Sequence, residues 1–108
     1  MHYDLLIITN EKVPTHFLNG INYLVLSEND HLLSPFLTKK QDTFDYLIIS
    51  NYQIISHFDV INDNQIIITN HYFQTSISHI FAIGKCNFSV KPLLEQWQTI
   101  INYIKNGE

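Results

Sequence analysis

Runs of consecutive apolar residues, rather than alternating ones, dominate the first half of the chain. Such runs predict strands that are buried on both faces, as in a parallel sheet. The predicted strands cover residues 3–9, 21–26, 45–50 and, further along, 80–83. The connector at 11–20 contains Pro14 and has room for one helical turn but hardly for a full crossover helix. These features indicate an α/β fold with a parallel core.

Two helices are predicted from residues that suit helix ends. Ser34 and Pro35 suit the N-cap and first position of a short helix over 34–40. Pro92 suits the first turn of a longer helix that ends at Gly107. An apolar stripe with helical spacing runs along this second helix and is expected to pack on the sheet: Leu93, Leu94, Trp97, Ile100, Ile101 and Ile104. Tyr103 lies off the centre of that stripe and is the better candidate for a dimer contact.

A turn signal at residues 62–64, Asn-Asp-Asn, separates two further apolar segments. The segment 65–69 is typical of a strand. The segment 52–55 either continues the third strand or forms the first arm of a hairpin. The sequence therefore predicts a β-hairpin insertion beside the parallel sheet.

Length and charge limit the classes of function. The 108 residues predict one domain over 1–108, without room for separate cofactor and substrate domains. Only 15% of residues are charged, so the surface depends on uncharged polar groups and self-association is expected. The net charge of -4 and the absence of a basic stripe argue against nucleic acid and membrane surfaces as partners.

Cysteine usage and hydropathy add further limits. The single cysteine, Cys86, excludes an internal disulfide, a CxxC redox pair and a cysteine-rich metal site. No apolar run has the length of a membrane span, and no signal-like segment opens the chain. We therefore expect a soluble, cytoplasmic protein.

The most specific stretch covers residues 70–85. A polar run leads into a short apolar strand that ends at Gly84, where a missing side chain would let backbone approach a ligand. The residues Q-T-S-I-S-H-I-F-A-I-G-K at 74–85 resemble T-S-x-P-G-I-F-A-x-G-D, the closing motif of thioredoxin-reductase-type flavoprotein disulfide reductases. The resemblance is strongest from Asp45 to the C-terminus. It implies an α/β, reduced Rossmann-like FAD-binding-type domain, with a central parallel sheet, the hairpin insertion and the C-terminal helix.

The first two strands also resemble that family. Residues 3–8 are similar to its Y-D-x-x-I-I-G strand, and L-V-L-S-E at 24–28 is similar to its second strand. The resemblance implies that Glu28 would hold the ribose of the adenosine. With Gly84 and Lys85, Glu28 completes the candidate cofactor-binding residues of this FAD/NAD(P)-binding-like domain.

The departures from the family concern its chemistry. Residues 9–14 are T-N-E-K-V-P, so the family's G-x-G-x-x-G phosphate cradle is missing and Glu11 places negative charge there. Lys85 stands where the family's aspartate binds the flavin, and Ser78-His79 replaces a Pro-Gly turn. The redox cysteine pair and the nicotinamide domain are absent. We therefore expect neither catalytic nor metal-binding residues, and no cofactor, with FAD or another nucleotide as the alternative.

Three side-chain groups have both a chemical and a structural interpretation. The Cys86 thiol could have its pKa lowered by Lys85, but a small buried residue is the favoured interpretation. Lys85 and Lys91 could hold an anion before the last helix, but lysines reaching solvent are favoured. The histidines lack metal-site spacing and are expected on the surface: His2, His16, His31, His57, His71 and His79.

Three functional hypotheses follow. The first is a degenerate, thioredoxin-reductase-like protein without the parent redox activity, acting through protein contacts as a homo-oligomer. The second is a flavin- or nucleotide-binding component of an oxidoreductase, with a site completed at a subunit interface. The third is an unrelated small structural α/β domain.

Overall fold

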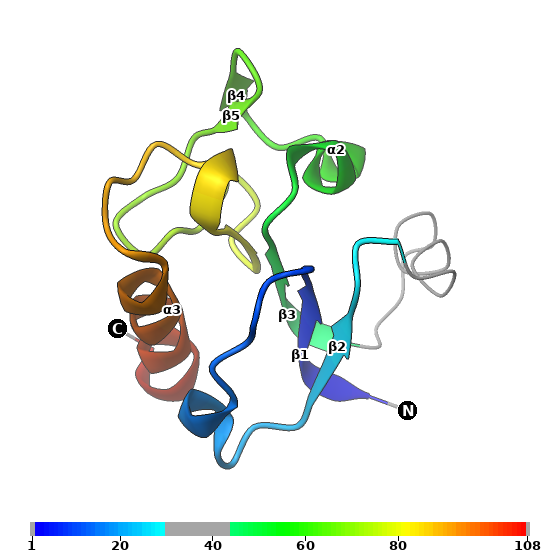
Figure 1. Ribbon diagram of the computed structural model, residues 1–108, viewed down its shortest axis with the longest axis vertical. Coiled ribbons are helices and arrows are strands. Elements are labelled where there is room, and N and C mark those ends of the chain that lie inside the picture. The colour runs from blue at the N-terminus through cyan, green and yellow to red at the C-terminus, as the bar shows by residue number, and fades with distance from the viewer. Residues whose placement is uncertain (1, 30–43, 108) are drawn as a thin grey trace.

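A four-stranded parallel sheet forms the centre of the computed structural model, which describes residues 2–29 and 44–107 (Figure 1). Its strand order is β2-β1-β3-β6. The strands are β1 (Tyr3–Ile8), β2 (Tyr23–Leu26), β3 (Phe44–Ile49) and β6 (Ile80–Ala82). All neighbouring pairs are parallel, so the predicted parallel core is confirmed. The helix expected over 34–40 lies outside the described residues.

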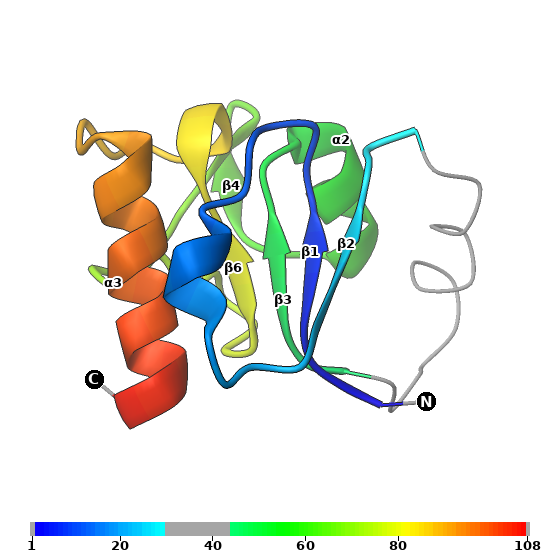
Figure 2. The same ribbon diagram turned by 60° about the horizontal axis from the view of Figure 1, so that its bottom comes forward.

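Both faces of the sheet are buried, which explains the continuous apolar runs. Leu5 and Ile7 of β1 pack on one face, beneath α3 (Leu93–Asn106) and the 3₁₀ helix η1 (Thr15–Leu18). Leu6 and Ile8 point to the opposite face, where α2 (Tyr52–Ile55) packs. Figure 2 shows α3 and η1 on the near side of the sheet and α2 behind it. Successive side chains of a strand point to opposite faces, so a strand between two layers must be apolar throughout.

Helix α3 begins and ends close to the predicted positions. It starts directly after Pro92, and its C-cap is Gly107, which has a left-handed backbone (φ 77°) and donates its N–H to the Tyr103 carbonyl at 2.7 Å. Trp97 and Ile100 of the apolar stripe are buried against the sheet. Leu94 was expected in the same stripe but is 56% exposed. Each helical residue turns about 100°, so Leu94 lies at the outer margin of the buried face.

A hairpin forms beside the parallel sheet, but its bounds differ from the predicted ones, since Asn62 and Asp63, expected in the turn, form its first strand. Strands β4 (Asn62–Asp63) and β5 (Ile66–Ile67) pair antiparallel across Asn64 and Gln65, whose φ values of 56° and 69° suit a tight hairpin turn.

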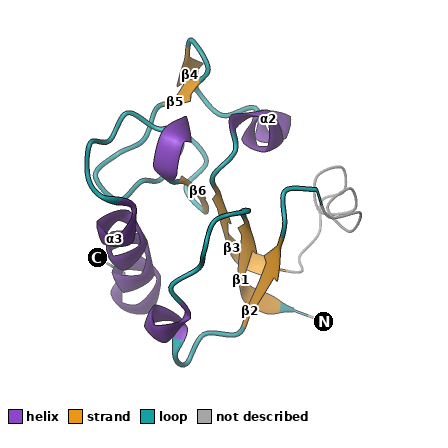
Figure 3. Cartoon of the chain, in the orientation of Figure 1, coloured by secondary structure: helices purple, strands orange, loops and turns teal. Residues whose placement is uncertain are grey.

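Residues 52–55 were expected to continue the third strand or to form a hairpin arm, and this prediction is wrong. They form helix α2, which Figure 3 distinguishes from the strands. Asn51 caps this helix, since its Oδ1 accepts the Ile54 N–H at 3.2 Å. A short apolar run does not distinguish helix from strand by period, and the cap decides here. A 3₁₀ turn, η2 (Ser56–Phe58), continues α2. No helix of the described residues is long and apolar enough to cross a membrane.

Candidate functional site at the carboxyl ends of the strands

The candidate site is the edge of the sheet where β1, β2 and β3 end. Strand β1 lies between β2 and β3, so the chain leaves β1 toward one side and later returns to the other. In open parallel sheets, ligands bind outside the carboxyl ends of the strands at such a point. The polar residues that follow the three strands therefore lie where a ligand of such a sheet would bind.

Glu28, which follows β2, is the centre of a hydrogen-bond network at this edge. Its Oε2 accepts the backbone N–H of Asn10 at 3.0 Å and the hydroxyl of Ser50 at 3.3 Å. Its Oε1 accepts the side-chain amide of Asn51 at 2.8 Å. The Glu28 N–H in turn donates to Asn10 Oδ1 at 2.8 Å. Both carboxylate oxygens are thus bound to the chain itself.

Thr9 and Ser50 extend the network between β1 and β3. Their hydroxyl oxygens lie 2.7 Å apart, and Thr9 Oγ1 also accepts the Glu11 N–H at 3.0 Å. Thr9 is buried although it is polar, and these bonds satisfy its hydroxyl. The network therefore joins the loops that follow β1, β2 and β3 by hydrogen bonds within the chain.

Gly84 follows β6 and has a left-handed backbone (φ 72°), which explains the glycine at this position. A Cβ added there would meet Leu93 Cδ1 at 3.7 Å, an ordinary contact distance. The Gly84 N–H donates to Gln96 Oε1 at 3.0 Å. The glycine thus allows the chain to turn into the 3₁₀ helix η3 (Gly84–Cys86). Its backbone N–H is hydrogen-bonded to a side chain of α3.

Gln96 is the residue at this corner that the sequence interpretation missed. It is only 2% exposed, its Oε1 also accepts Asn87 Nδ2 at 3.1 Å, and its Nε2 donates to the Lys91 carbonyl at 2.9 Å. The available signal was its place beside Trp97, within the apolar stripe. Lys85 and Lys91, the predicted anion candidates, both have exposed side chains.

Cys86 is a buried thiol, as the favoured interpretation expects. Burial raises its pKa to about 12, and the negative charge of Glu28 adds to the increase. The Sγ lies 3.1 Å from the Ile83 carbonyl oxygen, to which it donates. The alternative interpretation, a pKa lowered by Lys85, is wrong because loss of solvent outweighs the hydrogen bonds that favour the thiolate.

The histidines do not gather at any site among residues 2–29 and 44–107. All five in those ranges are exposed: His2, His16, His57, His71 and His79. His31 lies outside them. Within the same ranges no three His, Cys, Asp or Glu residues are placed to hold a metal ion. His2 pairs with Asp45, with Nε2 and Oδ1 3.0 Å apart.

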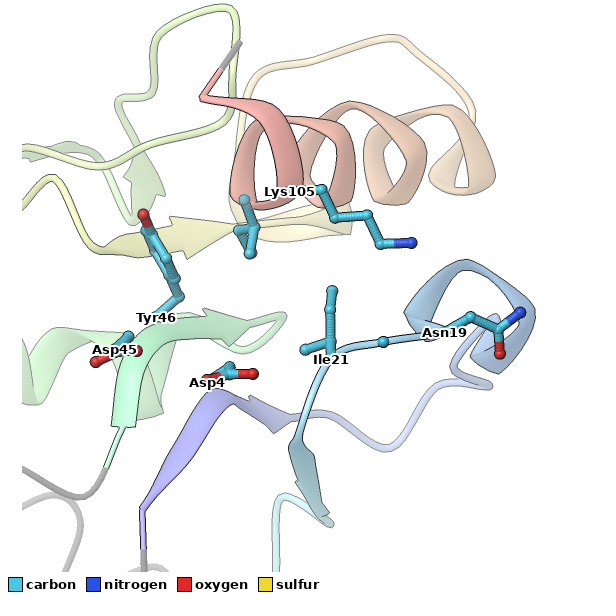
Figure 4. A pocket seen from close by; sticks show the side chains of 8 residues that line it. Asp4, Asn19, Ile21, Asp45, Tyr46 and Lys105 are labelled. Atoms are coloured by element: carbon cyan, nitrogen blue, oxygen red, sulfur yellow. The ribbon is translucent and has the colours of Figure 1, made fainter.

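A hollow of about 460 Å³ lies at the opposite end of the sheet, at the start of β1 and β3 (Figure 4). Asp4 and Asp45 flank it, and Lys105 at the end of α3 faces it. Both carboxylates have partners within the chain: Asp4 accepts the Asn22 N–H at 3.0 Å, and Asp45 pairs with His2. Because the hollow lies at the starts of the strands, it is remote from Glu28, Gly84 and Lys85, which follow the strand ends.

Tyr103, the predicted dimer contact, packs within the chain. Its ring centroid lies 4.8 Å from that of Tyr72 and 5.9 Å from that of Phe81. Its hydroxyl accepts Gln74 Nε2 at 3.2 Å. Through these contacts Tyr103 helps to pack α3 against the sheet.

Comparison with known proteins adds no family to this geometry. No family model matches the chain, and no match was found among curated proteins or solved structures. What the chain shows by itself is a small mixed α/β fold with a four-stranded parallel sheet and a C-terminal helix.

Proposed function

We propose that the protein is a reduced, non-catalytic relative of the thioredoxin-reductase-type flavoproteins, and that it acts through protein contacts as a homo-oligomer. The strand order β2-β1-β3-β6 supports a Rossmann-type origin, in which β1 lies between the strands that follow it. The C-terminal helix after β6 supports the same origin. Fold alone carries no activity, so the proposal depends on the site.

The state of Glu28 is the observation that carries the non-catalytic part of the proposal. The resemblance implies a carboxylate that binds ribose hydroxyls, yet both oxygens of Glu28 accept bonds from Asn10, Ser50 and Asn51. A ribose hydroxyl would have to share the two carboxylate oxygens with these three protein donors. The Gly84 N–H is engaged in the same way by Gln96. Such internal satisfaction favours a closed, structural edge over a cofactor site.

An exposed apolar surface favours action through protein contacts. It consists of Phe88, Val90 and Leu94, which are 60%, 98% and 56% exposed. These residues lie on the loop before α3 and on its first turn, drawn in orange in Figure 2. Large apolar side chains that are exposed within one short segment of the chain favour a contact site. We call this set the Val90 surface.

Sedimentation velocity over a wide concentration range tests the proposal. The expected result is a concentration-dependent dimer or higher oligomer, which Phe88→Asp combined with Val90→Asp converts to a monomer. Ile61→Asp is the matched control, because Ile61 is 63% exposed but lies beside the hairpin, and it should leave association unchanged. A wild-type chain that stays monomeric at all concentrations, or a control that dissociates equally, would contradict the proposal.

A further inference from the structure

Two Asn-Gly pairs occur in the chain, Asn19-Gly20 and Asn106-Gly107. Asparagine is among the chemically labile residues of proteins, and a following glycine leaves its own backbone nitrogen unshielded because it has no Cβ. All four residues are exposed, and both glycines have a left-handed backbone, with φ 84° at Gly20 and 77° at Gly107. Apart from adjoining residues, no described residue has an atom within 4 Å of a Cβ added at either glycine. The two pairs are therefore alike in exposure and in the space around them.

The first pair forms the centre of a tight turn between η1 and β2. The Ile21 N–H donates to the Leu18 carbonyl at 3.0 Å. Asn19, with φ -56° and ψ 128°, and Gly20, with φ 84°, fit the two central positions of a type II turn. The hydrogen bond of such a turn uses the N–H of the fourth residue and leaves that of the third free. Accordingly, the Gly20 N–H has no hydrogen-bond partner among residues 2–29 and 44–107.

The second pair belongs to a helix end. Asn106 is the last residue of α3, and the Gly107 N–H donates to the Tyr103 carbonyl at 2.7 Å. A backbone nitrogen can attack the side chain of the preceding asparagine only after rotation about the Cα–C bond of that asparagine. For Asn106 this rotation also breaks the hydrogen bond of Gly107. The Gly20 nitrogen has no such bond to lose.

We propose that Asn19 is a site of spontaneous deamidation and that α3 protects Asn106 from the same reaction. The Gly20 nitrogen forms a bond to the side-chain carbonyl carbon of Asn19, and the bond from that carbon to Nδ2 breaks. The side-chain NH₂ leaves as ammonia, with the proton of the Gly20 N–H. Water then opens the cyclic imide at either of its carbonyl groups. The products are aspartate and isoaspartate, in which the backbone runs through the former side chain.

Isoaspartate at this position alters the entry into β2. It adds an extra carbon atom to the backbone between Leu18, which is buried, and Asn22, whose N–H donates to Asp4 Oδ2 at 3.0 Å. Because both ends of the turn are held, the longer path disturbs the turn and the start of β2. Aspartate changes only the charge. None of these residues belongs to the Val90 surface, so deamidation and self-association are tested separately.

Incubation of the purified chain in warm, mildly alkaline buffer, followed by cleavage after glutamate and mass spectrometry, tests the site. Peptides 12–28 and 96–108 report on Asn19 and Asn106 separately. In the folded chain Asn19 should deamidate about three- to tenfold faster than Asn106, because only the Gly107 N–H must first lose a hydrogen bond. In guanidinium chloride the two rates should become similar. Asn19→Gln should remove the fast product and leave the rate at Asn106 unchanged.

The effect on β2 has its own measurement. Ion exchange enriches the deamidated chain, which has gained a negative charge, and the same peptides report its isoaspartate content. The isoaspartate form should unfold at a lower urea concentration than Asn19→Asp, which has the same charge on an unaltered backbone. Equal midpoints would overturn the effect on β2. Equal rates at Asn19 and Asn106 in the folded chain, or an intact Asn19 when the unfolded chain deamidates, would overturn the site itself.

Discussion

Glu28 accepts a hydrogen bond from the side-chain amide of Asn51 at 2.8 Å, although the two residues follow different strands. Asn51 caps α2 with its other side-chain atom, Oδ1. One pair thus connects the ends of β2 and β3 with the start of a helix. The carboxylate that the resemblance implies for ribose binding therefore has partners within the fold.

Replacing the carboxylate tests that role. We expect Glu28→Gln to lower the free energy of unfolding by about 1–3 kcal/mol, because an amide NH₂ would face the Asn10 N–H or the Asn51 amide, both donors. Urea denaturation measures the change. Glu11→Gln, at an exposed position in the neighbouring loop, should alter stability by less than about 0.5 kcal/mol. Equal effects of the two variants would remove Glu28 from the structural role.

Gln96 should be as important as a buried apolar residue. Gln96→Leu leaves the Gly84 N–H, the Asn87 amide and the Lys91 carbonyl without this partner, so we expect a loss of about 2 kcal/mol or more. Thermal or urea unfolding measures it. Gln98→Leu, on the exposed side of α3, is the matched control and should be nearly neutral. A small effect of Gln96→Leu would show that water replaces the lost side chain.

Gly84→Ala distinguishes a backbone requirement from a requirement for close approach. The left-handed φ should cost about 1–2 kcal/mol, with no additional clash, since the nearest atom to the new Cβ is 3.7 Å away. Gly20→Ala should cost a similar amount, because Gly20 has φ 84° and no atom within 4 Å of an added Cβ. Urea denaturation measures both losses in the free energy of unfolding. A much larger loss at Gly84 than at Gly20 would indicate that atoms lie closer to the added Cβ than the 3.7 Å of the structure.

Cys86 should be almost unreactive in the folded protein. With a pKa raised from 9.0 to about 12, its thiolate fraction near pH 8 is about a thousandfold below that of an unfolded thiol. Labelling with an aromatic disulfide should therefore be slow in buffer and fast in urea. Fast labelling of the folded chain would contradict the burial of this thiol.

The same shift predicts a pH dependence of stability. The folded pKa is raised, so the contribution of the neutral thiol is fully present below about pH 9 and is lost as the pH rises toward about 12. Urea midpoints of the wild type should fall over this alkaline range more steeply than those of Cys86→Ala. Parallel pH profiles of the two chains would contradict the shift.

The sequence predicted those parts of the fold that depend on local chemistry. The four strands of the parallel sheet and the end of α3 at Gly107 follow from neighbouring residues, and the structure confirms them. The turn expected at 62–64 lies instead at Asn64 and Gln65, because Asn62 and Asp63 form β4. Residues 52–55 were predicted wrongly because the cap from Asn51 outweighs a strand-like composition. Leu94 was assigned to the core because period alone does not fix the width of a buried face.

The candidate site was harder to predict, because its bonds join residues that are distant in sequence. Glu28, Gly84 and Lys85 were selected by resemblance, but the partners of Glu28 come from the ends of β1 and β3. Gln96 binds Gly84 across twelve positions of the chain. Neither pairing has a local pattern, so only the folded arrangement shows that these groups are already engaged.

Isothermal titration calorimetry of the purified protein with FAD measures whether the strand ends bind a cofactor. We expect no saturable heat, because Glu28 and the Gly84 N–H are bound within the chain. One-to-one binding of FAD at micromolar concentration, weakened by Glu28→Ala, would contradict it and would restore the strand ends as a cofactor site.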